Sequence, residues 1–359
     1  MTGPTNEYAS MQGARCAWFV RARHVPDALA KIGLVGPADR LVVRANDFTD
    51  AFRSAFGAGR LSFARDVTPE AFLDATRACP HPAAGGPREG HASYADGAGA
   101  GYDRLFWFVN SIGCFGLRVA DLRGLADAAR DAGAILIVDN TVASAWGCLP
   151  LEAGAHVVCE GLDRVAAGEL AERAVGIAVA RDARGRGRRR VADPLAADAY
   201  RMLAQRLGGE RVQPSFDVSG RDLDALARGF ATLPARMQRH DDNARAVAEY
   251  LAANPYVPSV AYPGLPSHPD HEVAARTLRH GFGPAVDFEL PDGLSARGLI
   301  AACPASYRSA RAGGPMTRLS APRGDEARFI RLFAGVDDPL EIVDSLDQAM
   351  RLSCDPPQP

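Results

Sequence analysis

The segment VDNTVASAWGCLPLEAGAHVVCEGLDRVAAGEL, residues 138–170, predicts a buried strand, a loop, a second strand and a turn. The β-branched run AILIVDN, residues 134–140, leads into it and ends in Asp139. Just upstream, residues 119–133 carry apolar side chains at helical spacing and end in glycine, which commonly follows a helix. Strand, helix and strand in this order predict a parallel sheet, in which ligands bind at the carboxyl ends of strands. Asp139 stands at such an end.

Two more compact apolar runs, residues 40–47 and 104–111, predict further strands of the same sheet. We therefore expect an α/β fold with a mainly parallel sheet in a large domain, residues 1–215. Residues 79–101 are rich in Gly, Ala and Pro and predict a flexible surface insertion. Residues 181–190 carry a run of arginines, which we expect to be a solvated loop because the chain as a whole is not basic.

The pattern changes from about residue 216 onward. Residues 231–255 predict a long amphipathic helix, and short segments punctuated by Pro and Gly follow it. A final helix is predicted over residues 338–352. These elements predict a second, smaller α+β domain over residues 216–359.

Composition excludes several classes of protein. The chain has 359 residues, of which 47% are hydrophobic and 23% charged, so it can bury a substantial core. With 41 basic and 43 acidic residues, no strong net charge attracts it to nucleic acid or to an anionic membrane. No targeting leader and no apolar run long enough to cross a bilayer stand out, so we expect a cytoplasmic protein. Its seven cysteines are scattered without a C-x-x-C pair, which favours reduced thiols over disulfides or a metal site.

The basic residues are distributed very unevenly between the two types. Lys31 is the only lysine, so 40 of the 41 basic residues are arginines. This removes almost every candidate for chemistry that needs a primary amine.

Several motifs occur in the order typical of a known family: VDNTVAS, PLEAGAHVV, TLPARMQRHDDNARAVAEYL, VAYPGLPSHPDH, GFG and FIRLFAGVDDPLEIVDSLDQAM. Over residues 34–352 the chain resembles the Cys/Met-metabolism family of pyridoxal-phosphate (PLP) enzymes, which includes cystathionine synthases and lyases and their O-acetylhomoserine-using relatives. The resemblance implies the aspartate aminotransferase-like fold, fold type I, with PLP as cofactor. It also implies a small amino-acid-like ligand and a homo-oligomer, a dimer or a tetramer.

The resemblance assigns roles to three residues. Asp139 matches the carboxylate that pairs with the pyridine nitrogen, and Phe48 falls where an aromatic ring stacks on the cofactor. Arg331 matches the arginine that grips the substrate carboxylate. Each also has a structural interpretation. Asp139 is then a satisfied strand-end carboxylate and Phe48 a core aromatic residue, while Arg331 is a partner of Asp337 or Asp338.

The lysine that holds PLP in the family is replaced. The family motif is Ser-x-Thr-Lys, and this chain has GLDR at residues 161–164. A guanidinium stays protonated and is not a primary amine, so Arg164 can neither form the Schiff base nor move the substrate proton. We expect it to form an ion pair with Asp139 or Asp163 instead. Lys31 lies far upstream in a predicted helix and does not easily substitute.

The phosphate contacts that the resemblance implies are altered as well. The Ser-Gly-Met turn of the family corresponds to ARH, residues 22–24. The two hydroxyls of the lysine motif are replaced by Gly161 and Asp163, and a carboxylate repels a phosphate. The segment that touches the ring hydroxyl corresponds to residues 112–115, and the N-terminal arm is shortened because few residues precede Trp18.

Two functional hypotheses follow. In the first, the protein is a catalytically degenerate homologue of the transsulfuration enzymes, a pseudoenzyme kept as a structural, regulatory or ligand-binding protein. PLP binding is then weak, non-covalent or absent, and the partner is the chain itself or an active paralogue. In the second, it is an active lyase or transferase of cysteine and methionine metabolism with PLP held non-covalently by Asp139 and Phe48, and His24, Cys114 or Cys159 serves as base. The combined loss of lysine and phosphate contacts favours the first.

The order of the motifs also predicts one feature of the site. We expect the carboxyl end of the strand over residues 134–138 to lie beside the strand around residues 154–159. Asp139 and Arg164 should then line one cleft.

Overall fold

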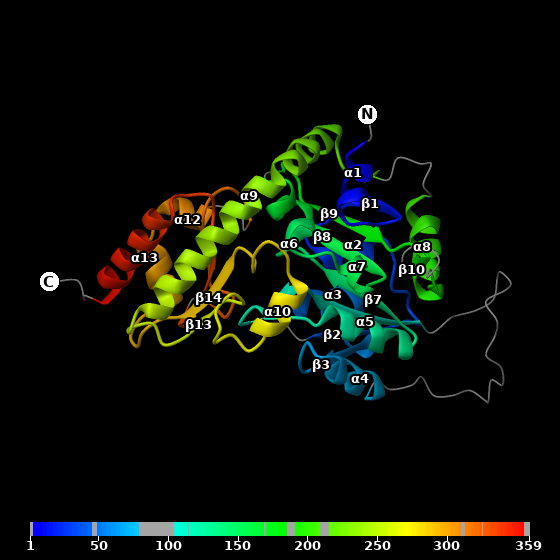
Figure 1. Cartoon of the computed structure of the whole chain (residues 1–359), viewed down its shortest axis with the longest axis horizontal. Coiled ribbons are helices and arrows are strands. Elements are labelled where there is room, and N and C mark those ends of the chain that lie inside the picture. The colour runs from blue at the N-terminus through cyan, green and yellow to red at the C-terminus, as the bar shows by residue number, and fades with distance from the viewer. Residues whose placement is uncertain are drawn as a thin grey trace.

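The computed structural model describes residues 3–44, 49–78, 104–113, 115–168, 170–184, 191–208, 215–309, 313–324 and 326–354. Three sequence predictions fall wholly or largely outside these ranges: the insertion at residues 79–101, Phe48, and most of the basic loop at residues 181–190. The described chain forms two main sheets, and Figure 1 shows the larger one beside the smaller one with a long helix running between them.

The larger sheet has eight strands in the order β12-β1-β9-β8-β7-β4-β2-β3. They are β1 (Cys16–Arg21), β2 (Arg40–Arg44), β3 (Leu61–Ala64), β4 (Leu105–Asn110), β7 (Ala134–Asp139), β8 (Val157–Gly161), β9 (Ala174–Val179) and β12 (Ser215–Phe216). Only β9 runs antiparallel to its neighbours. The expected α/β fold with a mainly parallel sheet is therefore confirmed.

Helices cover both faces of this sheet because its strands are apolar on both sides. In β4, Phe106 and Phe108 point into one core and Trp107 points into the other, as the two-residue period of a strand requires. The first core is closed by α2 (Val25–Lys31), α3 (Thr49–Phe56) and α8 (Pro194–Leu207), and the second by α4 (Pro69–Arg77) and α5 (Leu122–Asp131).

The smaller sheet is antiparallel, in the order β13-β14-β16-β15, and is covered by helices on its outer side. Its strands are β13 (Val260–Ala261), β14 (Ala285–Glu289), β15 (Arg318–Ser320) and β16 (Phe329–Phe333), and its helices are α11 (Ala296–Ala302), α12 (Ala305–Ser309) and α13 (Pro339–Cys354). The sequence division between residues 215 and 216 falls inside β12 and stays a prediction.

The remaining elements connect these layers. They are α1 (Pro4–Met11), η1 (Ala58–Arg60), β5 (Ile112–Gly113), β6 (Arg118–Val119), α6 (Ser144–Gly147), α7 (Pro150–Ala153), η2 (Leu162–Ala166), β10 (Ala183–Arg184), β11 (Val191–Ala192), α9 (Gly220–Ala253) and α10 (His271–Thr277). No helix within the described ranges is both long and apolar enough to span a membrane.

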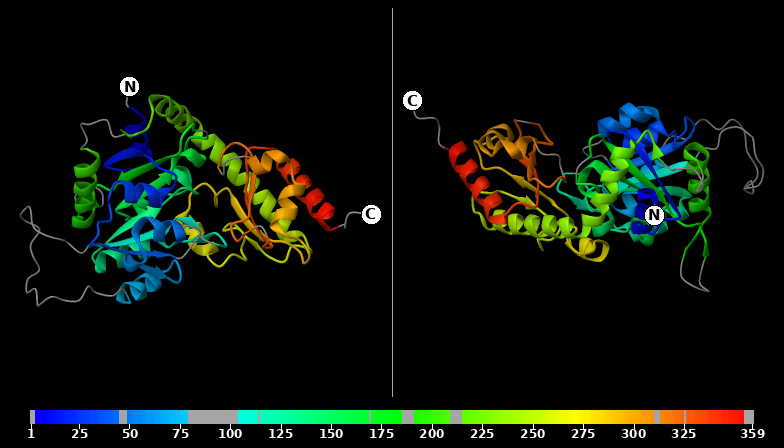
Figure 2. Two further views of the ribbon diagram at one scale, coloured as in Figure 1. Left: turned by 180° about the vertical axis from the view of Figure 1, so that it is seen from behind. Right: turned by 90° about the horizontal axis from the view of Figure 1, so that it is seen from above.

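The long helix α9 links the two sheets, and both views in Figure 2 show it extending from one to the other. It begins eleven residues before the start predicted from the amphipathic pattern at residue 231. The reason is a cap, since the Ser219 hydroxyl accepts a hydrogen bond from the backbone N–H of Asp222 at 3.1 Å. Pro234 lies inside the helix and does not end it.

Helix α1 packs against β1 and α9, and two of its neighbouring side chains contact the buried carboxyl group of Glu160. The Tyr8 hydroxyl and the Gln12 amide donate hydrogen bonds to Glu160 Oε2 at 3.2 and 2.9 Å. Burial raises the pKa of Glu160 to about 8. The folded protein therefore favours the protonated form of this side chain.

Stability should fall with rising pH because of Glu160. Its pKa lies near 4.5 in an unfolded chain and about 8 in the fold, so its contribution is complete below pH 4.5 and is lost as pH rises through 8. We expect Glu160→Gln to raise the free energy of unfolding at pH 8 by about 1–3 kcal/mol and to change it little at pH 5. Urea denaturation between pH 5 and 8.5 measures this. Replacing the exposed Glu70 by Gln should leave the slope unchanged, and parallel profiles for both variants would contradict the assignment.

Candidate ligand-binding site

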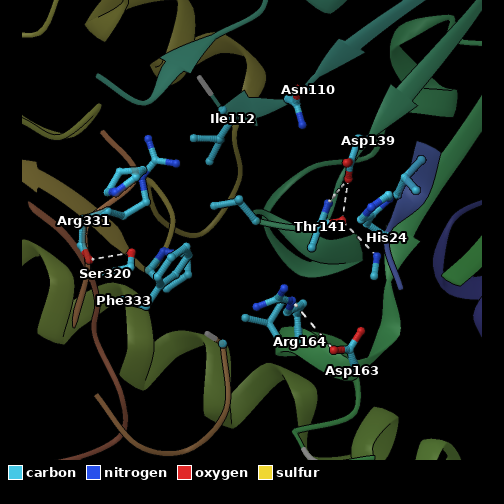
Figure 3. A pocket seen from close by; sticks show the side chains of 18 of the residues that line it. His24, Asn110, Ile112, Asp139, Thr141, Asp163, Arg164, Ser320, Arg331 and Phe333 are labelled. Carbon is cyan, nitrogen blue, oxygen red and sulfur yellow. Dashed lines mark hydrogen bonds and ion pairs between the residues drawn. The ribbon is translucent and has the colours of Figure 1, made fainter. Parts of the chain in front are cut away.

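A cavity of about 480 Å³ opens at the carboxyl ends of β7 and β8, between the larger and the smaller sheet. Asp139 at the end of β7 and Arg164 just after β8 line it from the larger sheet, and Arg331 lines it from the smaller sheet (Figure 3). Arg318 of the smaller sheet lines it as well. Strands β7 and β8 are parallel neighbours. Both parts of the prediction are thus confirmed, because the two strand ends lie side by side and Asp139 and Arg164 line one cavity.

Asp139 is held at the end of β7 by its neighbour Thr141. The carboxylate is 4% exposed and accepts hydrogen bonds from the backbone N–H and the hydroxyl of Thr141 at 3.0 and 2.5 Å. The hydroxyl in turn accepts a hydrogen bond from the N–H of Gly161 at 2.9 Å, which ties β7 to the end of β8. Burial raises the pKa of Asp139 to about 6, and the Thr141 hydrogen bonds and the charge of Arg164 oppose the rise. Asp139 is therefore mainly ionised at neutral pH.

Arg164 lies in η2, directly after β8, where the family's lysine is expected. Its Nε is 3.8 Å from Asp163 Oδ2, and Arg173 Nε lies 3.8 Å from the same oxygen. Asp163 is buried. Of the two ion-pair partners predicted for Arg164, Asp163 therefore lies within ion-pair distance. The positive charge of Arg164 also acts on Asp139 and lowers its pKa.

Arg331 is buried and forms a two-pronged ion pair. Its Nε and Nη2 donate to the two carboxylate oxygens of Asp287 at 2.7 and 2.8 Å, and Asp287 also accepts a hydrogen bond from the N–H of Gly116. The predicted partners, Asp337 and Asp338, were wrong, because their carboxylates accept hydrogen bonds from other groups. Asp287 faces Arg331 across the β14–β16 pair, a neighbour that proximity in the sequence does not reveal.

The turn before α2 also reaches the cavity, through Arg23 and His24. His24 caps the helix, with Nδ1 accepting a hydrogen bond from the N–H of Asp27 at 3.2 Å. Burial is the main cause that lowers the pKa of His24, so its ring is neutral at neutral pH. Ala22 does not line the cavity, and its side chain packs against the core beside α2.

Residues 112–115 are only partly at the site. Ile112 and Gly113 line the cavity, whereas Phe115 is partly exposed and stacks edge-on against Phe329. Cys114 lies outside the described residues. Cys159 is fully buried, and burial raises the pKa of its thiol, which disfavours its use as a base.

Arg318 was not predicted as a site residue, and it lines the cavity from β15 of the smaller sheet. It is partly buried. Burial, and then the positive charges of Arg164 and Arg173, lower the pKa of Arg318. Within the described part of the chain no carboxylate pairs with it. No motif marks this residue, because β15 is only three residues long and the charges that act on Arg318, those of Arg164 and Arg173, belong to distant segments of the chain.

Other candidate chemistry is limited. Within the ranges that the structure describes, no group of three or more His, Cys, Asp or Glu side chains is arranged to hold a metal ion.

A mainly parallel sheet with an aspartate at a central strand end, joined by a long helix to a small antiparallel sheet, is the fold type I architecture of PLP-dependent enzymes. A solved structure of a methionine gamma lyase from Micromonospora echinospora superposes on this chain with a TM-score of 0.72. The two are 25% identical, and the match covers 97% of this chain and 86% of that one.

The model of the Cys/Met metabolism PLP-dependent enzyme family matches residues 104–351, and the chain belongs to this family. It is 33% identical to a cystathionine gamma-synthase from Mycobacterium bovis over 260 residues, which cover 69% of this chain and 62% of that protein. It is 29% identical to an L-methionine gamma-lyase from Pseudomonas putida over 253 residues, covering 66% of this chain and 59% of that protein. The match thus spans about three fifths of these relatives.

Proposed function

We propose that the protein is a catalytically degenerate homologue of the PLP-dependent transsulfuration enzymes that keeps the cavity as a ligand-binding site. The observation that carries this proposal is Arg164, which lies at the carboxyl end of β8 and lines the cavity in the lysine's expected place. The only lysine of the chain, Lys31, ends α2. Its Nζ donates to the carbonyl oxygen of Arg21 and to Asp217, both at 3.0 Å, and it does not line the cavity.

The described residues do not fit a covalently attached PLP. Asp139 suits a protonated ring nitrogen, because it is buried, mainly ionised and oriented by Thr141. The described residues that line the cavity include no primary amine, however, and Gly161 and Asp163 provide no hydroxyl for a phosphate. The Asp163 carboxylate would repel that phosphate. PLP is the cofactor of the family, and we propose that here it binds weakly, without a covalent bond, or not at all.

An active enzyme with non-covalent PLP is the alternative. It needs another base, and His24 is the described candidate because its neutral ring lines the cavity. One ring nitrogen is occupied by the cap of α2, which leaves Nε2 near Asp27 at 3.4 Å. We therefore retain the degenerate homologue as the proposed function.

The test is the covalent capture of PLP by the purified protein. We expect no PLP to remain attached after borohydride reduction and denaturation, because no amine lies at the site. We also expect no elimination from cystathionine or O-acetylhomoserine. Mass spectrometry of the reduced protein and a keto-acid assay measure the two outcomes. A reduced adduct at the cavity, or steady turnover, would overturn the proposal.

Restoring the amine alone should not restore the enzyme. We expect Arg164→Lys to bind PLP at most weakly, because Asp163 and the Arg23–His24 turn still disfavour the phosphate. The double variant Arg164→Lys with Asp163→Thr should bind PLP more tightly than the single variant. Absorbance titration with PLP measures both. Full activity from the single change would show that the phosphate contacts are intact.

Assembly and location stay predictions. Family resemblance supports a homo-oligomer, a dimer or a tetramer, with a hetero-oligomer containing an active paralogue as the second form. A small amino-acid-like ligand is proposed for the cavity, and a cytoplasmic location is supported by the composition and the cysteine pattern.

A further inference from the structure

We infer that Arg164 and Arg318, here named the arginine cluster, bind the oxyanion group of a small organic ligand, a carboxylate or a phosphate. This inference rests on the ligand-binding function proposed above, and it specifies the chemical class of the ligand. Arg164 and Arg318 line the cavity, and Arg173, which does not line it, pairs with Asp163.

Arg318 is the residue whose charge indicates an anion site. Arg164 and Arg173 share one oxygen of Asp163 at 3.8 Å, a distance longer than a good hydrogen bond. Among the described residues, no carboxylate neutralises Arg318, although its side chain is partly buried. The positive charges of Arg164 and Arg173 act on Arg318 and help to lower its pKa. A bound anion would relieve their mutual repulsion and would accept charge-assisted hydrogen bonds.

The two cavity-lining arginines come from different parts of the fold. Arg164 follows β8 of the larger sheet, and Arg318 belongs to β15 of the smaller sheet. Figure 3 shows Arg164 and Asp163 on one side of the cavity and Asp139 on another. An anion bound between Arg164 and Arg318 would therefore connect the two sheets.

The rest of the cavity suits the body of an organic molecule. Ile112, Val142 and Phe333 supply apolar surface around the arginines. Arg331 does not add free charge, because both oxygens of Asp287 engage it. The carboxylates of Asp139 and Asp163 repel anions, so the oxyanion belongs on the Arg318 side of the arginine cluster and the remainder of the ligand extends toward Asp139.

The experiment measures binding of inorganic phosphate and of succinate to the full, PLP-free chain by isothermal titration calorimetry at low ionic strength. We expect at least one probe to bind with a Kd of about 1 mM or tighter. Arg318→Gln should weaken that binding by about tenfold or more, because it removes a charged donor. Arg276→Gln, the loss of an exposed arginine on α10 that does not line the cavity, should change it by less than about twofold.

The two probes separate the possible sources of the oxyanion. Tighter binding of phosphate assigns a phosphate ligand, and tighter binding of succinate assigns a carboxylate ligand. Circular dichroism verifies the fold of each variant, and Arg164→Gln replaces Arg318→Gln if the latter does not fold. Failure of both probes to bind, or equal binding by the cavity variant and the Arg276 control, would overturn the site.

Failure here is distinguishable from failure of the proposed function. Phosphate and succinate carry no aldehyde, so their binding does not depend on an amine in the cavity. A borohydride-reducible PLP adduct would therefore refute the degenerate homologue without affecting the calorimetry. Loss of Arg318-dependent binding would refute the oxyanion site alone.

Discussion

Replacing Arg331 by methionine is expected to lower the free energy of unfolding by about 3–5 kcal/mol, since it leaves a buried carboxylate without its cation. Asp287 is fully buried, and both of its oxygens accept hydrogen bonds from the Arg331 guanidinium. The hydrogen bond that Asp287 accepts from the N–H of Gly116 does not replace the positive charge of Arg331. The apolar stem of the arginine is largely retained by methionine, so the loss reports the ion pair rather than packing.

Urea denaturation at pH 7 measures this change, with two variants for comparison. The double variant Arg331→Met with Asp287→Leu should recover most of the stability, because it removes both buried charges together. Arg328→Met disrupts an exposed ion pair with Asp292 and should cost less than about 1 kcal/mol. A loss no larger than this exposed control would argue against a structural role for Arg331 and would return it to the ligand-gripping role that the family resemblance implies.

Replacing Gly229 by alanine is expected to lower the free energy of unfolding by about 2–3 kcal/mol. Helix α9 crosses the loop after η2 at this glycine, and a Cβ there would lie 2.5 Å from the Cα and the carbonyl oxygen of Ala167. Both contacts are with backbone atoms, which cannot rotate away as a side chain can. The strain outweighs the gain of about 1 kcal/mol that alanine brings to a helix interior.

The same helix offers a matched control. Gly220→Ala, at the start of α9, meets nothing within 4 Å and should be neutral or slightly stabilising. Comparing the urea midpoints of the two variants therefore isolates the contact with Ala167. Equal midpoints would show that the helix and the loop separate easily. A lower midpoint for Gly229→Ala alone would show that α9 fixes the loop that follows Arg164.

Local patterns in the sequence were sufficient to predict the central strands and one helix of the larger sheet. The β-branched run that became β7 and the run that became β4 both lie within a residue or two of their predicted bounds. Helix α5 begins later than the start of its pattern at residue 119, because the Asp121 carboxylate accepts the N–H of Gly124 and caps it. These features depend on neighbours a few residues away, which the sequence displays directly.

The sequence by itself determined the mainly parallel sheet and the position of Asp139 at a strand end. It also showed that arginine replaces lysine at position 164, and it predicted that Asp139 and Arg164 line one cleft. The tertiary structure alone decided the ionic partners. Asp287 pairs with Arg331 across two antiparallel strands, and the packing of the smaller sheet brings a second cation, Arg318, to the cavity that Arg164 lines. The physical reason is range. Strand and helix patterns arise from contacts along a few residues, whereas an ion pair depends on where separate strands come to lie once the chain has packed.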